Sequence, residues 1–83
     1  MIEKNVEVNI PENGARPIAK LVQIASQYQS KVSIKQDSKT VNAKSIMGMM
    51  TVGLSNGQNI DIEVEGEDEN DAMKSIEQYL IGK

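Results

Sequence analysis

The feature that most constrains the fold of this chain is the alternation of apolar and polar side chains along short segments. Ile60, Ile62 and Val64 form the clearest case, and Val32 and Ile34 form a second. Alternate side chains of a strand point to opposite faces of its sheet, so this pattern predicts strands with one buried and one solvated face. Such strands are typical of an antiparallel sheet covered on one side only. Two further strands are expected, at residues 40–43 and in the N-terminal segment that contains Ile2, Val6, Val8 and Ile10.

Three other segments repeat their apolar residues with the period of an amphipathic helix. The first is expected at about residues 16–27, with Pro17 in the first turn, where its missing N–H costs nothing. A short helix is expected from Ser45 to near Gly53. The last helix is expected to follow the acidic residues 67–71, and its apolar face is defined by Ala72, Met73, Ile76, Tyr79 and Leu80. The element order β-α-β-β-α-β-α predicts an α+β fold, an open-faced β-sandwich with a four-stranded antiparallel sheet and three helices on one face.

Composition excludes several kinds of chemistry. The 83 residues make one small domain, residues 1–83, and include no histidine and no cysteine. Histidine acid–base catalysis, phosphohistidine, thiol nucleophiles and zinc sites with imidazole or thiolate ligands are therefore excluded, and we expect no cofactor. No apolar run is long enough to span a membrane and no signal peptide is recognisable, so a cytoplasmic protein is expected.

Charge is unevenly distributed along the sequence. Up to residue 56 there are seven basic and four acidic side chains, and after it two basic and eight acidic ones. A basic and an acidic side of the domain are therefore expected. Scattered cations with almost no aromatic residues between them do not indicate direct nucleic-acid binding. The acidic stretch at residues 63–71 lacks the ligand spacing of a calcium loop and is explained by a solvated strand end and a helix start.

The most informative segment for function is NAKSIMGMM, residues 42–50. Ser45 is a good N-cap, because its side-chain oxygen can accept a hydrogen bond from an otherwise unpaired backbone N–H. In a helix that starts there, Ile46, Met47 and Met50 share one face, and Met49 points elsewhere, towards the core. The segment therefore predicts a small methionine-rich patch beside a hydroxyl group that can be modified.

Three motifs together resemble the HPr phosphocarrier family of the bacterial sugar phosphotransferase system. They are Ala15-Arg16-Pro17, NAKSIMGMM, and Gly66-Glu67-Asp68 before the last helix. The resemblance spans nearly the whole chain and implies an HPr-like fold. In that family a phosphoryl-carrying histidine precedes Ala-Arg-Pro, but here the residue is Gly14. The loop around Glu12 and Asn13 also departs from the family pattern and looks about one residue shorter. The pattern is most similar to the histidine-less, Crh-like members.

The resemblance implies a non-catalytic regulator of carbon catabolite repression that cannot carry phosphohistidine. Ser45 aligns with the serine that HPr kinase/phosphorylase modifies, and the phosphorylated form would bind a catabolite control protein, a LacI-type transcription factor. Ile46, Met47 and Met50 match the family's partner-docking patch. Arg16 matches the arginine beside the family's histidine and is a candidate to pair with phosphorylated Ser45 or with a partner's carboxylate. Lys20 departs from the family, which usually has an apolar contact residue there.

Other interpretations of the same residues remain open. Ser45 can be only an N-cap, the methionines can belong to the core, and Arg16 and Lys20 can be solvated surface charges. A binding module that is never phosphorylated would act through its methionine patch or as a weak homodimer with an exchanged first strand. A small enzyme of the acylphosphatase type would instead use Arg16 and Asn42, although Pro17 removes a backbone donor from the loop that such an enzyme needs.

Overall fold

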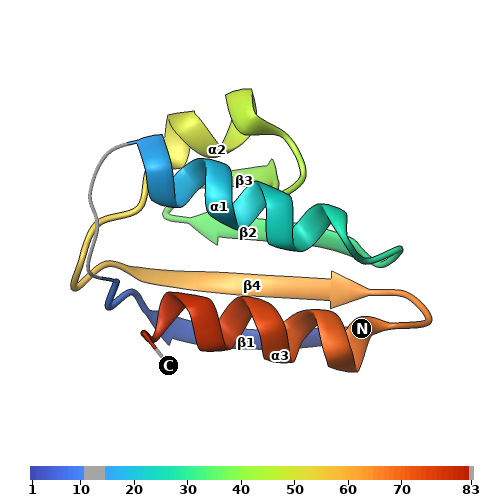
Figure 1. Cartoon of the computed structure of the whole chain (residues 1–83). Coiled ribbons are helices and arrows are strands. Elements are labelled where there is room, and N and C mark those ends of the chain that lie inside the picture. The colour runs from blue at the N-terminus through green and yellow to red at the C-terminus, as the bar shows by residue number, and fades with distance from the viewer. Residues whose placement is uncertain (11–14, 83) are drawn as a thin grey trace.

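Three helices cover one face of a four-stranded antiparallel sheet, as the sequence predicts (Figure 1). The computed structural model describes residues 1–10 and 15–82. The element order is the predicted one. The elements are β1 (Ile2–Glu7), α1 (Ala15–Ser26), β2 (Lys31–Gln36), β3 (Lys39–Asn42), α2 (Ile46–Val52), β4 (Asn59–Glu65) and α3 (Glu69–Leu80).

The strands are arranged in the order β1-β4-β2-β3, so β4 lies between two neighbours. Val64 is paired with Ile2 of β1 and Val32 of β2, and Ile62 is paired with Ile34 of β2. This register aligns the apolar residues of adjacent strands on one face. A shift by one residue would turn the whole apolar set of a strand towards solvent, so the hydrophobic pattern fixes the register.

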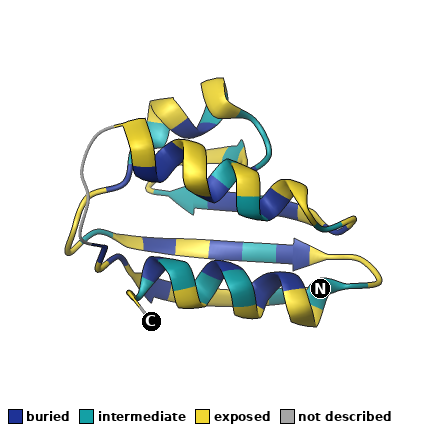
Figure 2. Ribbon diagram, in the orientation of Figure 1, coloured by how far each residue is buried: buried dark blue, intermediate teal, exposed yellow. Residues whose placement is uncertain are grey.

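The core lies between the sheet and the helices (Figure 2). Val32, Ile34, Ile62 and Val64 are fully buried, whereas the residues between them in sequence are partly or fully exposed. The helices contribute one stripe each. Their buried residues are Pro17, Ile18, Leu21 and Ala25 of α1, Met49 of α2, and Ala72, Met73, Ile76 and Leu80 of α3.

The first strand is shorter than the alternation in the sequence predicts. It ends at Glu7, although Val8 and Ile10 are buried as expected. Beyond Glu7 the pairing passes to the turn before β4, where Val8 donates its N–H to the carbonyl of Gln58 and accepts from the N–H of Gly57, both at 2.8 Å. The backbone N–H of Ile10 donates to Oδ1 of Asn56, with an N···O distance of 2.6 Å. Asn9 likewise donates its N–H to the carbonyl of Leu80. The alternating burial therefore continues beyond the end of β1. The turn predicted at residues 11–14, with Gly14 and the altered loop, lies outside the described residues.

The start of α3 is fixed to the start of β2 by Asp68. Its carboxylate accepts hydrogen bonds from the N–H groups of Gln29 and Ser30, both at 2.9 Å, and from the hydroxyl of Ser30. The hydrogen bonds from Ser30 and Gln29 hold the pKa of Asp68 below its usual value. Gly66 has φ 153°, and a Cβ at this position would lie 2.7 Å from Cα of Ser30. Only glycine therefore permits this close approach.

Candidate functional site

Ser45 is the N-cap of α2, as predicted. Its backbone is extended, and its Oγ accepts a hydrogen bond from the N–H of Gly48 at 3.2 Å. The residue is half-buried, so its hydroxyl is not sealed inside the core. A Cβ on Gly48 would lie 3.5 Å from that Oγ, which is an ordinary van der Waals distance. The glycine therefore leaves the space beside the hydroxyl unoccupied.

The helix that begins at Ser45 has two different apolar faces. Met49 is fully buried and belongs to the core, as predicted. Ile46, Met47 and Met50 are 48%, 81% and 57% exposed, and we call these three residues the α2 patch. These three large apolar side chains lie on about one and a half turns of helix and do not belong to the core. The sequence interpretation of the methionines as core residues therefore holds for Met49 and not for the patch.

The turn before Ser45 is fixed by its own polar groups. Oδ1 of Asn42 accepts from the N–H of Lys44 at 2.8 Å, and the carbonyl of Asn42 accepts from the N–H of Ser45 at 3.0 Å. Ala43 is fully buried and donates its N–H to the carbonyl of Val32. The backbone of the site is thus anchored to β2.

Arg16 and Lys20 are both exposed on α1, one turn apart. The two helices run in opposite directions, so the start of α1 lies beside the C-terminal end of α2 (Figure 1). The other end of the pair is marked by Lys44, whose Nζ donates to the carbonyl of Tyr28, two residues after α1 ends. Arg16 therefore lies at the end of the helix pair opposite Ser45. Pairing of Arg16 with a partner's carboxylate fits this position better than pairing with a phosphate on Ser45.

The same geometry bears on the acylphosphatase-like interpretation. Asn42 ends β3 beside Ser45, and its side-chain oxygen is already hydrogen-bonded within the turn. Arg16 starts α1 at the far end of the helix pair. An arginine and an asparagine that act on one phosphoryl group must converge on it. The structure does not bring these two residues together.

Charge differs between the two faces of the domain. Helices α1 and α2 contain Arg16 and Lys20 and no acidic residue within their described bounds. The open face of the sheet is predominantly acidic, with two lysines on β2. There Nζ of Lys35 lies 3.1 Å from Oε2 of Glu63, and this contact raises the pKa of Lys35 and lowers that of Glu63. The basic side expected from the sequence is limited to α1 and α2, because α3 lies in the same layer and contains Glu69, Asp71 and Glu77 with only one lysine.

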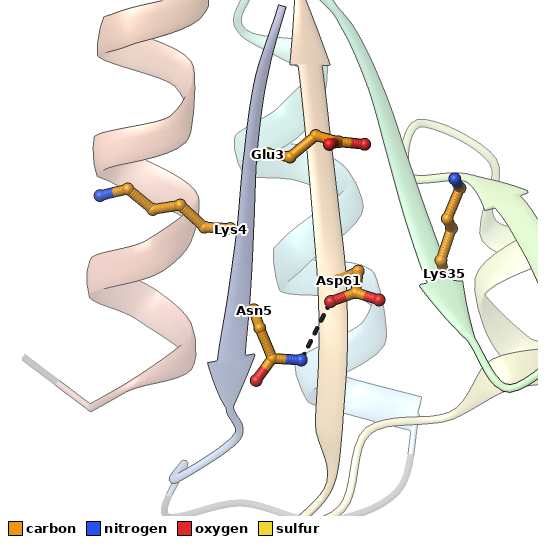
Figure 3. Close-up of a pocket in the computed structure, with 5 residues that line it drawn as sticks. All are labelled: Glu3, Lys4, Asn5, Lys35 and Asp61. Atoms are coloured by element: carbon orange, nitrogen blue, oxygen red, sulfur yellow. Dashed lines mark hydrogen bonds between the residues drawn. The ribbon is translucent and has the colours of Figure 1, made fainter.

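Two shallow hollows, of about 240 and 230 Å³, lie on the open sheet face and contain no residue of the Ser45 site. Figure 3 shows the first, where Nδ2 of Asn5 donates to Oδ1 of Asp61 at 3.0 Å. Lys4 points away from the others towards α3, and its Nζ donates to Glu77 at 2.9 Å. All the lining residues except Met1 are polar or charged, which is unlike the largely apolar pockets that bind small organic ligands.

Two classes of site are absent from the part of the chain that the structure describes. Among residues 1–10 and 15–82, no three or more acidic side chains are grouped so that they could hold a metal ion. No helix within those residues is both long and apolar enough to cross a membrane.

Sequence reasoning missed two long-range polar contacts, one next to Ser45 and one at the start of α3. Lys44 precedes Ser45, but its acceptor is a backbone carbonyl 16 residues earlier, which leaves no local pattern to detect. The sequence places Asp68 at an acidic helix start and in the Gly66-Glu67-Asp68 motif, but its bonds to Gln29 and Ser30 join elements far apart in sequence. The available signal for the second contact was Asp68 itself, a short acidic residue two positions after Gly66, the glycine that lies close to Ser30.

Comparisons with known proteins agree with the fold and the motifs. The family model described as "PTS HPr component phosphorylation site" matches residues 2–81. The HPr-like protein Crh of Halalkalibacterium halodurans is 42% identical over 81 residues, which cover 96% of each chain. The crystal structure of the phosphocarrier protein HPr of Bacillus anthracis has a TM-score of 0.89 at 39% identity and covers 95% of both chains. Crh of Bacillus subtilis, solved as a dimer with a swapped domain, has a TM-score of 0.79 at 38% identity and covers 100% of this chain and 97% of its own.

Proposed function

The chain belongs to the HPr family of the phosphotransferase system, and we propose that within it the protein is a regulator of carbon catabolite repression switched by phosphorylation of Ser45. A single observation carries the proposal. The half-buried hydroxyl of Ser45 caps a helix whose next turn exposes Met47 to 81%. A modifiable group and a docking surface are therefore adjacent.

Histidine chemistry is not available to this chain. The sequence contains no histidine, and the residue before Ala15-Arg16-Pro17 is Gly14, which has no nucleophile. Transfer of a phosphoryl group through phosphohistidine therefore requires a side chain that the protein lacks. The protein is accordingly proposed to act by binding and not by catalysis.

A phosphate on Ser45 would change the local charge substantially. Phosphoserine carries about −1.5 to −2 charges at pH 7 and three strong acceptor oxygens. At the start of a helix, these oxygens meet unpaired backbone N–H groups and the positive end of the helix dipole, an interaction worth roughly 0.3–1 kcal/mol at an exposed site. Phosphate oxygens that the helix start does not engage remain available to a partner.

The α2 patch is the proposed docking surface. Methionine side chains are flexible and polarisable, so they adapt to the surface of a partner. HPr kinase/phosphorylase is the proposed modifying enzyme and a LacI-type catabolite control protein is the proposed partner of the phosphorylated form. Arg16 and Lys20 extend the surface along α1 and supply the cations for carboxylates of a partner.

Phosphorylation is tested by incubating the protein with HPr kinase/phosphorylase and ATP and measuring intact mass. We expect one added phosphate in the wild type and in Ser38→Ala, a control at an exposed serine in the turn between β2 and β3. We expect none in Ser45→Ala. A phosphate added to Ser45→Ala would contradict the assignment.

The exposed patch also supports a second function, in which the unphosphorylated protein binds partners directly. Met47 is exposed without any modification, so docking does not strictly require a phosphate. A pull-down that is insensitive to Ser45→Ala and lost in Met47→Asp would favour this function over the first. Size-exclusion chromatography with light scattering, run on the same variants, would test whether a weak homodimer forms.

A further inference from the structure

The Nζ atom of Lys44 is hydrogen-bonded away from the residue that follows it. It donates to the backbone carbonyl oxygen of Tyr28 at 2.7 Å, in a partly buried contact. Tyr28 belongs to the connection between α1 and β2, residues 27–30, which we call the α1–β2 connection. The residue adjacent to Ser45 thus joins the start of α2 to a segment 16 residues earlier in the chain.

The α1–β2 connection is bonded on its other side to α3. The hydroxyl of Tyr28 is hydrogen-bonded to that of Ser75, and the N–H groups of Gln29 and Ser30 donate to the carboxylate of Asp68. Ser30 is buried, so its polar groups depend on these protein partners. The connection therefore contacts the start of α2 through Lys44 and the start of α3 through Asp68.

We propose that phosphorylation of Ser45 draws the ammonium group of Lys44 from the Tyr28 carbonyl to the phosphate and so destabilises the α1–β2 connection where it meets α3. The proposal rests on the proposed function only in taking Ser45 as the modified residue. It adds that the modification changes the molecule beyond α2.

The direction of the change follows from the two acceptors. The present acceptor is a neutral carbonyl, whereas the phosphate would be nearly dianionic at pH 7. The bond to the carbonyl is charged on the donor side only, whereas a bond to the phosphate pairs two opposite charges and adds their Coulomb attraction. The lysine stem is flexible, and Lys44 directly precedes Ser45 in the chain. The Tyr28 carbonyl and a phosphate on Ser45 would therefore compete for the same ammonium group. A phosphate shifts this equilibrium because it interacts differently with the two arrangements.

Arg16 and Lys39 are both placed away from Ser45. Arg16 lies at the opposite end of the α1–α2 pair. Nζ of Lys39 donates to the carbonyl of Thr51, near the C-terminal end of α2, at 3.4 Å. Lys39 is therefore a matched control, because it is also a lysine bonded to a backbone carbonyl but not next to the phosphate.

The test uses protein in which phosphoserine is incorporated at position 45 during synthesis, so that neither a kinase nor a partner is needed. Amide hydrogen exchange and ¹⁵N chemical shifts of Gln29 and Ser30 are measured by NMR at pH 7. We expect phosphorylation to move the Gln29 ¹⁵N shift and to raise the exchange rate of both amides about five-fold, the effect of losing one hydrogen bond. We expect unphosphorylated Lys44→Met to reproduce this change, and phosphorylation of that variant to add nothing. Lys39→Met is expected to respond as the wild type does.

Each other outcome counts against the proposal. If the Gln29 and Ser30 amides are unchanged in protein whose mass confirms one phosphate, Lys44 does not move. If Lys44→Met exchanges these amides at the wild-type rate, the bond to Tyr28 does not stabilise the connection. If phosphorylation has its full effect in Lys44→Met, another group transmits it. If HPr kinase/phosphorylase does not modify the protein, the proposed function is wrong. The present test can still be carried out, because its phosphoserine is incorporated during synthesis.

Discussion

Replacing Met49 and Met47 separately by alanine tests the two-faced character of α2. Met49 is fully buried, and truncation of a buried methionine leaves a cavity that costs about 2–5 kcal/mol. Met47 is 81% exposed, and a substitution at such a position changes stability by less than about 0.5 kcal/mol. In a domain of this size, 1 kcal/mol shifts Tm by about 4–8 °C. We therefore expect Met49→Ala to lower Tm by at least about 8 °C and Met47→Ala to leave it within a few degrees.

Thermal and urea denaturation followed by circular dichroism provide the assay. Met49→Leu is the conservative companion, because a swap of similar volume costs less than about 1.5 kcal/mol and separates loss of volume from loss of the thioether. Binding of the phosphorylated protein to its partner should fall in Met47→Ala and stay unchanged in folded Met49→Leu. Equal destabilisation by the two alanine substitutions would refute the assignment of the two faces.

Three further predictions concern the site and its anchors. Ser45→Ala removes the acceptor for the Gly48 N–H and should lower the free energy of unfolding by ~1 kcal/mol in urea denaturation. Gly48→Ala should raise it by about 0.5–1 kcal/mol, because the helix loses a glycine and the new Cβ meets no close contact. The same substitution should slow phosphorylation in a kinase assay, since that Cβ lies 3.5 Å from the Ser45 Oγ. Because its folded pKa is depressed, Asp68 contributes stability that is present above the unfolded pKa of about 3.9 and lost as pH falls through the lower folded value. Urea midpoints between pH 2 and 7 should therefore decline less steeply on the acid side in Asp68→Asn, and an unchanged slope would contradict this account.

Local patterns in the sequence predict much of this fold. The alternation of Ile60, Ile62 and Val64 predicts a strand with one buried face, and the structure has it as β4. The position of Ser45 before an apolar run predicts its role as N-cap, and the spacing of Met49 predicts its burial. Each of these features depends on residues within about one turn or a few strand positions, where side-chain chemistry acts directly on the backbone.

What the sequence does not predict depends on contacts between distant segments. After Glu7 the backbone N–H of Ile10 bonds to the side chain of Asn56, 46 residues away, while the Ile10 side chain stays buried in the core. The contact of Lys44 with Tyr28 has a backbone acceptor, which any residue type supplies. The separation of Arg16 from Ser45 follows from the antiparallel packing of α1 and α2 and not from either motif.

The most direct test of the proposed function is calorimetric titration of a LacI-type catabolite control protein with this protein in two forms. One form is unmodified and the other carries phosphoserine at position 45. One to three new charge-assisted hydrogen bonds to the phosphate should make the phosphorylated form bind at least about ten-fold more tightly, equivalent to ~1.4 kcal/mol. Equal affinities for the two forms would contradict the account.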